Sequence, residues 1–128
     1  MNITENHIID EDKVKKFSEL VDDYNPIHLD SEYAKGTKFG KPIVHGMLIS
    51  SLFSSIIATK YPGPGSIYIS QNLQFKNPCF VGEEIIVSIE LIEEISNKYK
   101  LKTQIKNTKG DILVDGEALI KNTNNGRI

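Results

Sequence analysis

Two residues able to exchange protons lie close together near the start of the chain. Asp23 and His28 are separated by four residues, in the segment Asp-Tyr-Asn-Pro-Ile-His. Proline disfavours helical geometry in the residue before it, so Asn25 should lie in a loop that Pro26 stiffens. A carboxyl and an imidazole facing one volume can hold a water between them and act as general acid and base, an effect of ~10²–10⁴-fold. The spacing predicts such a pair without deciding which member is the acid.

A glycine at the start of the most apolar run is a second candidate. Gly46 precedes residues 47–60, whose apolar side chains recur at helical spacing. The first N–H groups of a helix are unpaired and lie at the positive end of its dipole, and glycine lets a carbonyl come close. We therefore predict that the Gly46 N–H stabilises an oxyanion, an effect of ~10²–10³-fold. The implied chemistry is addition or elimination beside a carbonyl.

Simpler interpretations of these polar residues stay open. Asp23 could be a turn cap and His28 a surface histidine, while Asp30 suits a helix cap. His45 could be catalytic, although packing or hydrogen bonding at the helix entrance is the simpler expectation. The spacing of His28 and Asp30 could suit a metal, but no third ligand stands out, so no metal is expected.

Two further residues have simple structural explanations. Cys79 follows a proline beside Phe80, where a small buried hydrophobe is the usual case, and a nucleophile would need an activating partner. Ser54 is most simply a small residue in a tight helix contact. The Lys residues are scattered and favour solvated surface.

The composition limits the class of protein. The chain has 128 residues with 39% hydrophobic and 25% charged residues and a net charge of −2, which is typical of one soluble domain spanning residues 1–128 and does not suggest nucleic acid or membrane partners. The single cysteine and the absence of a leader-like N-terminus favour the cytoplasm. The run 47–58 is too short to span a bilayer, which needs ~20 residues.

The pattern of apolar residues predicts helices first and strands after them. We expect helices over 11–22 and 47–60, a loop over 23–30, and one helical turn at 31–34. Expected strands cover residues 66–76, 84–94, 99–105 and 112–120, residues 2–9 are a candidate leading strand, and a frayed tail is expected after about 121. The prediction is an α+β fold in which an antiparallel meander, about five strands with the leading one, wraps one long buried helix.

Four ordered blocks of sequence resemble one family. They are residues 23–30, 41–48, 62–68 and 75–83, and together they are similar to the MaoC-like (R)-specific enoyl-CoA hydratases. The likeness is greatest to the short single-domain enzymes linked to polyhydroxyalkanoate synthesis. It covers nearly the whole chain, and four blocks in register are more specific than one Asn-Pro-x-His motif.

The resemblance implies a hot dog fold, usually dimeric, and reversible syn addition of water to a trans-2-enoyl-CoA. By position, Asp23 and His28 resemble the catalytic pair and the Gly46 N–H resembles the oxyanion donor. Ser54 resembles a serine that hydrogen-bonds the catalytic acid, and Asn25 resembles a residue that shapes the loop. The acyl-CoA is then the substrate, and no cofactor is implied.

One departure from the family pattern concerns the residue before the catalytic acid. Family members often have Gly or Glu there, whereas this chain has Asp22. A second carboxylate beside Asp23 could raise the pKa of Asp23 or share its role, although the spacing to His28 favours Asp23. The alternatives in function are an acyl-carrier-protein dehydratase, a non-catalytic acyl-thioester-binding or assembly module, and a thioesterase on the same fold.

Overall fold

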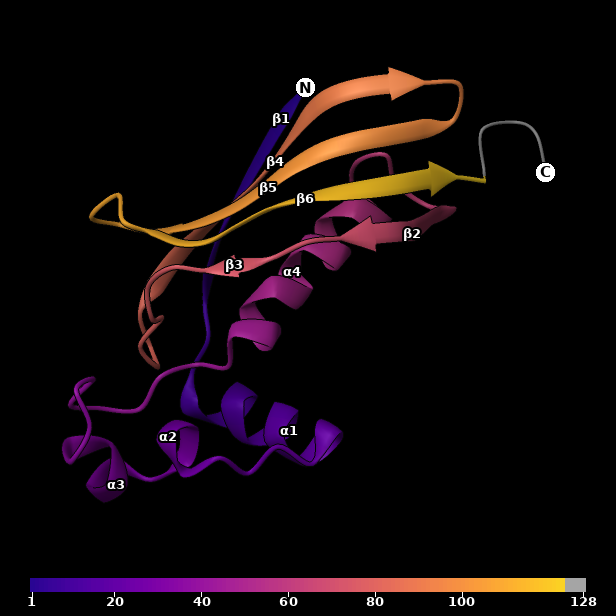
Figure 1. Cartoon of the computed structure of the whole chain (residues 1–128). Helices are drawn as coiled ribbons and strands as arrows, with labels where there is room; N and C mark the ends of the chain where they lie inside the picture. The colour runs from indigo at the N-terminus through magenta and orange to yellow at the C-terminus, as the bar shows by residue number, and fades with distance from the viewer. Residues whose placement is uncertain (124–128) are drawn as a thin grey trace.

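The computed structural model describes residues 1–123 and shows one curved antiparallel sheet with helices on its concave side (Figure 1). Its helices are α1 (Glu11–Val21), α2 (Pro26–Leu29), α3 (Ser31–Lys35) and α4 (Gly46–Thr59). Its strands are β1 (Asn2–Ile8), β2 (Ser66–Gln71), β3 (Gln74–Phe75), β4 (Glu84–Ile95), β5 (Lys98–Asn107) and β6 (Ile112–Asn122). The predicted α+β arrangement is confirmed.

The strand order is β1-β4-β5-β6-β2, with β3 also paired to β6. The predicted meander is therefore right for β4, β5 and β6 and wrong for the first strand after α4, which pairs with β6 at the far edge. The chain reaches β4 through a crossing segment, where Ile43 and Phe80 form an isolated bridge. This crossing places the segment 76–83 beside the loop that leads into α4.

The predicted strand 66–76 is divided into β2 and β3. Asn72 leaves the regular ladder, and its side-chain Oδ1 accepts a hydrogen bond from the N–H of Glu117. A Cβ on Gly116 would lie 2.0 Å from the carbonyl oxygen of Asn72. Glycine is required here because the two backbones approach so closely.

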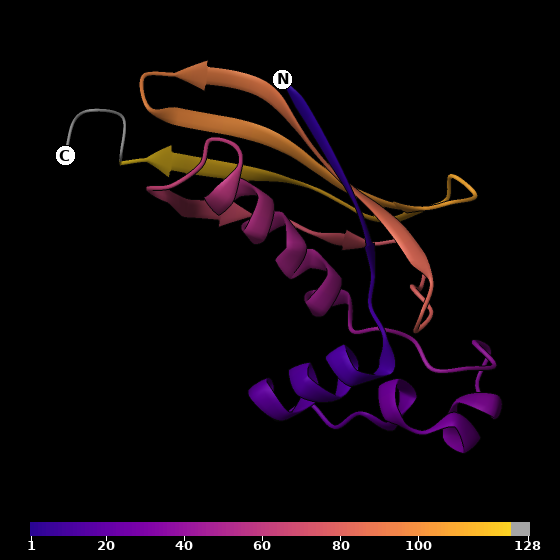
Figure 2. The same ribbon diagram turned by 180° about the vertical axis from the view of Figure 1, so that it is seen from behind.

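Helix α4 packs one face against the concave side of the sheet, as Figure 2 shows from behind. Phe53, Ile56 and Ile57 are buried against sheet residues such as Leu101 and Ile105. The opposite face of α4 carries exposed serines and Met47, which is 60% exposed. The helix is therefore covered on one face rather than all round, because its serines interrupt the apolar surface.

The predicted tail falls partly outside the described residues. Strand β6 continues to Asn122, where it pairs with Ser66 of β2, so the ordered strand extends past residue 121. The rest of the tail, residues 124–128, lies outside the described part of the chain.

Candidate active site

The C-terminus of α1 fixes the position of Asp23. Asp22 adopts the left-handed conformation with φ 59° and ends the helix, and the N–H of Asp23 donates to the Ser18 carbonyl at 3.0 Å. The Asp23 carboxylate accepts from the N–H of Asn25 at 3.1 Å. Asp23 is half-buried while Asp22 is exposed. The two acids therefore occupy different environments.

His28 lies on the short helix α2 and not in a loop, which corrects the prediction for residues 23–30. Pro26 suits the first turn because its missing N–H would have no partner there. Asn25 caps this turn by accepting from the N–H of Ile27 at 3.2 Å, as a loop-shaping residue would. Pro26 therefore starts a helical turn that places His28.

The hydrogen bond of His28 determines which nitrogen faces a substrate. Its Nδ1 donates to the carbonyl of Ile43 at 2.7 Å. A carbonyl can only accept, so Nδ1 carries a proton and, in the neutral tautomer, Nε2 is the nitrogen that can accept one. General base catalysis uses a nitrogen of this kind.

The fold brings Asp23, His28 and His45 together. One potential ligand atom from each lies within 4.8 Å of the others, and the rings of His28 and His45 stack with centroids 3.8 Å apart. The sequence analysis considered His28 with Asp30 as metal ligands, whereas the structure groups His28 with Asp23 and His45, and Asp30 caps α3. The absence of a metal stays a prediction.

His45 is held by contacts from α1. It is 3% exposed, its Nε2 hydrogen-bonds Ser18 Oγ at 3.0 Å, and Phe17 meets it edge-on. Burial first, and the neighbouring His28 second, hold the pKa of His45 below its ordinary value. The charge and the backbone of Asp23 act in the opposite direction and offset part of this lowering of the pKa. The Nδ1 of His45 has no hydrogen-bond partner among residues 1–123. His45 is thus a neutral residue that supports the ring of His28.

The depressed pKa predicts a pH-dependent stability. Below about pH 6.5 an unfolded His45 takes up a proton that the folded site resists, so the free energy of unfolding should fall as pH decreases from 7 to 5. The slope from one group is at most about 1.4 kcal/mol per pH unit. Urea unfolding of wild type and His45→Gln at pH 7 and pH 5 measures the free energy of unfolding. The variant should lose less of this free energy between the two pH values than wild type does. Equal losses would contradict a lowered pKa of His45 in the folded protein.

Gly46 begins α4 with its N–H free. No acceptor is found among the described residues for the N–H of Gly46 or Met47, and His45 makes no side-chain cap bond. The ring of Phe75 covers Gly46 so closely that a Cβ would lie 2.6 Å from two of its atoms. The predicted oxyanion role of Gly46 stays a prediction.

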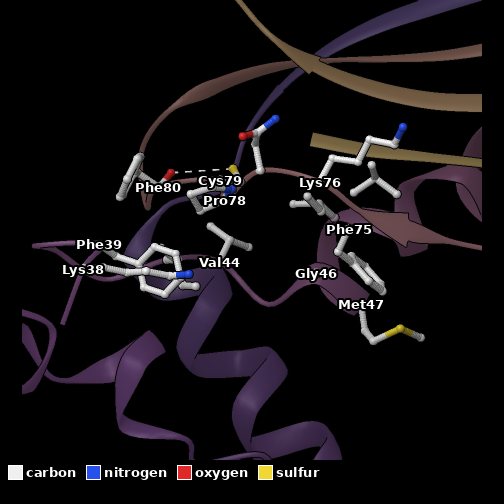
Figure 3. Close-up of a pocket in the computed structure, with 14 residues that line it drawn as sticks. Lys38, Phe39, Val44, Gly46, Met47, Phe75, Lys76, Pro78, Cys79 and Phe80 are labelled. Atoms are coloured by element: carbon white, nitrogen blue, oxygen red, sulfur yellow. Dashed lines mark hydrogen bonds between the residues drawn. The ribbon is translucent and has the colours of Figure 1, made fainter. Parts of the chain in front are cut away.

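A cavity of about 730 Å³ opens beside Gly46. Gly46, Met47 and Phe75 lie on one side of it and Lys38, Phe39 and Phe80 on the other (Figure 3). Asp23 and His28 do not line it, but Ile43 does, and its carbonyl holds His28. The cavity and the acid–imidazole pair therefore flank the same loop.

Ser54, Asp30 and Cys79 lie outside the cluster of Asp23, His28 and His45. Ser54 is exposed on α4 and lines a second cavity beyond Met47; no hydrogen bond joins it to Asp23 in the described part of the chain, so its role stays a prediction. Asp30 caps α3, as expected, by accepting from the N–H groups of Glu32 and Tyr33. Burial raises the pKa of Cys79 to about 12, which disfavours a nucleophilic thiolate.

Residues 2–114 match the MaoC-like domain, and the chain belongs to this family. It is 44% identical over 111 residues to the (R)-specific enoyl-CoA hydratase of Aeromonas caviae, covering 85% of this chain and 83% of that protein. It is 45% identical over 112 residues to a mitochondrial 3-hydroxyacyl-[acyl-carrier-protein] dehydratase of Solanum lycopersicum, covering 84% and 67%. The solved (R)-hydratase of A. caviae, described as involved in PHA biosynthesis, matches with a TM-score of 0.90 and 40% identity over 94% of this chain and 93% of that one. The predicted family and hot dog fold are confirmed.

Among residues 1–123, no helix is both long and apolar enough to cross a membrane.

Proposed function

We propose that this protein is an (R)-specific enoyl-CoA hydratase that reversibly hydrates trans-2-enoyl-CoA to (R)-3-hydroxyacyl-CoA. The observation that carries the proposal is the cluster of Asp23 and His28, whose side chains each offer an atom within 4.8 Å of the other, together with a helix start at Gly46 whose N–H has no acceptor among residues 1–123. A relative at 44% identity that is named (R)-specific enoyl-CoA hydratase supports the same reaction.

The proposed reaction assigns the proton transfers to the acid–imidazole pair and the stabilisation of negative charge to the Gly46 N–H. Water held between Asp23 and His28 adds its oxygen to C3 as one of its O–H bonds breaks, and the pair takes up that proton. A proton from the pair reaches C2 on the same face, so the pair ends with the charge it began with. The thioester oxygen gains negative charge in between and is stabilised by the Gly46 N–H.

Crotonyl-CoA tests this reaction directly. Hydration removes the conjugated double bond, so we expect its absorbance to fall and chiral analysis to show the (R)-3-hydroxyacyl product. Release of free thiol without hydration would indicate a thioesterase. Binding of crotonyl-CoA without turnover would indicate a non-catalytic module, and either result would contradict the proposal.

A second candidate differs in the carrier. The 45% identity to an acyl-carrier-protein dehydratase of similar sequence supports 3-hydroxyacyl-ACP as the substrate. Turnover of matched CoA and carrier-protein thioesters separates the two. We expect the larger kcat/KM for CoA, and a preference for the carrier protein would reverse the assignment.

We also infer that the protein is a homodimer. Strand β2 is an edge of the sheet, and its Ile67, Tyr68 and Ile69 are exposed. Such an edge favours pairing with a second copy, and sedimentation equilibrium giving a monomer would contradict this. A cytoplasmic location and a role in supplying polyhydroxyalkanoate synthesis stay predictions.

A further inference from the structure

The cavity beside Gly46 has a basic and aromatic end. Phe39 and Phe80 line it, and an ammonium group lies over each ring. Lys38 Nζ is 5.4 Å from the centroid of Phe39, and Lys41 Nζ is 4.7 Å from that of Phe80. Figure 3 places Lys38, Phe39 and Phe80 across the cavity from Gly46. We call these four residues, Lys38, Phe39, Lys41 and Phe80, the basic-aromatic end.

This end carries positive charge without a matching acid. None of the described residues that line the cavity is acidic. Within residues 1–123, Lys38 and Lys41 form no salt bridge, unlike Lys15, Lys16, Lys35, Lys60 and Lys100. Glu83 uses its carboxylate to accept the N–H of Phe80 at 3.1 Å, and in the described part of the chain it forms no salt bridge with either lysine. Both ammonium groups can therefore bind an anion.

We propose that the basic-aromatic end binds the nucleotide of CoA, with Lys38 and Lys41 on its phosphates and Phe39 and Phe80 against the adenine. The pantetheine arm then runs through the cavity to the thioester at Gly46. The inference rests on the proposed function and adds the residues that select the carrier.

The chemistry of the ligand matches this arrangement. Lysine binds phosphate as a point charge, and an aromatic ring offers a face on which a purine can stack. The cavity volume, about 730 Å³, falls in the range of ~300–1,000 Å³ usual for small-molecule sites. The cavity beyond Met47 is lined by no charged side chain among the described residues. Lys38 and Lys76 line the cavity beside Gly46. Charge therefore distinguishes this cavity from the one beyond Met47 as the one for phosphates.

The double variant Lys38→Glu/Lys41→Glu tests the proposal against a matched control. Lys98→Glu/Lys106→Glu changes the charge equally on exposed positions of β5 that face away from α4. We compare kcat/KM for crotonyl-CoA with that for its N-acetylcysteamine thioester, which lacks nucleotide and phosphates. The ratio should fall about tenfold in the Lys38/Lys41 variant, equivalent to about 1.4 kcal/mol for the two exposed charges together, and stay at the wild-type value in the control. The difference should shrink in high salt.

Calorimetric titration with CoA itself keeps the test independent of catalysis. The dissociation constant should rise about tenfold in the Lys38/Lys41 variant alone, even if wild type fails to hydrate crotonyl-CoA and the proposed function falls. Equal ratios and equal CoA affinities in all three proteins would overturn the proposal. A loss confined to carrier-protein thioesters would also overturn it, because the lysines would then dock an acidic protein.

Discussion

Replacing Asp23 by Asn, or His28 by Ala, is expected to lower kcat for crotonyl-CoA hydration by ~10²–10⁴-fold, the range for loss of a general acid or base. Asn at position 23 keeps an oxygen for the N–H of Asn25 but cannot take up a proton. Ala at position 28 removes the imidazole, one nitrogen of which lies within 4.8 Å of an Asp23 carboxylate oxygen. The absorbance assay measures kcat, and circular dichroism checks that each variant folds.

The adjacent acid provides the control for this experiment. Asp22→Asn removes a carboxylate one residue away, and Asn tolerates the left-handed conformation that position 22 adopts, φ 59°. Because Asp22 is an exposed helix cap, we expect kcat to stay within about twofold of wild type, as for other surface changes. Wild-type turnover in both Asp23→Asn and His28→Ala, or a loss in Asp22→Asn equal to that in Asp23→Asn, would contradict the assignment of Asp23.

Most of the fold followed from apolar periodicity. Residues 11–22 and 47–60 showed helical spacing and form α1 and α4, and the alternation in β4, β5 and β6 predicted their burial. Periodicity reports which side of an element is buried, but it does not report which strand is its neighbour. The pairing of β2 with β6 depends on the long crossing through residues 76–83, which no local pattern indicates.

The site was predictable where a motif was local and missed where it was assembled in space. Asp23 and His28 are close in sequence, so their spacing could be interpreted chemically. His45 joins them from another segment, through its contacts with Ser18 and His28. The prediction for 23–30 was also wrong about α2, because Pro26 was interpreted as ending helical structure rather than as starting a turn. The missed signal was Asn25 directly before Pro26, a cap followed by a residue suited to the first turn.

The second large effect concerns the contact between Gly46 and Phe75. A methyl group at position 46 would lie 2.6 Å from Cδ1 and Cε1 of Phe75, so the ring must move. Phe75 is 54% exposed and can turn toward solvent, and alanine favours a helix over glycine by about 1 kcal/mol. We therefore expect Gly46→Ala to keep its thermal stability.

Activity should respond very differently in Gly46→Ala. The added methyl and the displaced ring of Phe75 crowd the start of α4, where a thioester oxygen would meet the Gly46 N–H, and losing one such donor typically costs ~10²–10³-fold. We expect kcat/KM for crotonyl-CoA to fall by about 10²-fold, with most of the loss in kcat because the oxyanion exists only along the reaction path. Phe75→Ala and the double variant Gly46→Ala/Phe75→Ala separate the two causes: the double variant should stay as impaired as Gly46→Ala. Full recovery in the double variant would instead assign the loss to the displaced ring and contradict the oxyanion role of Gly46.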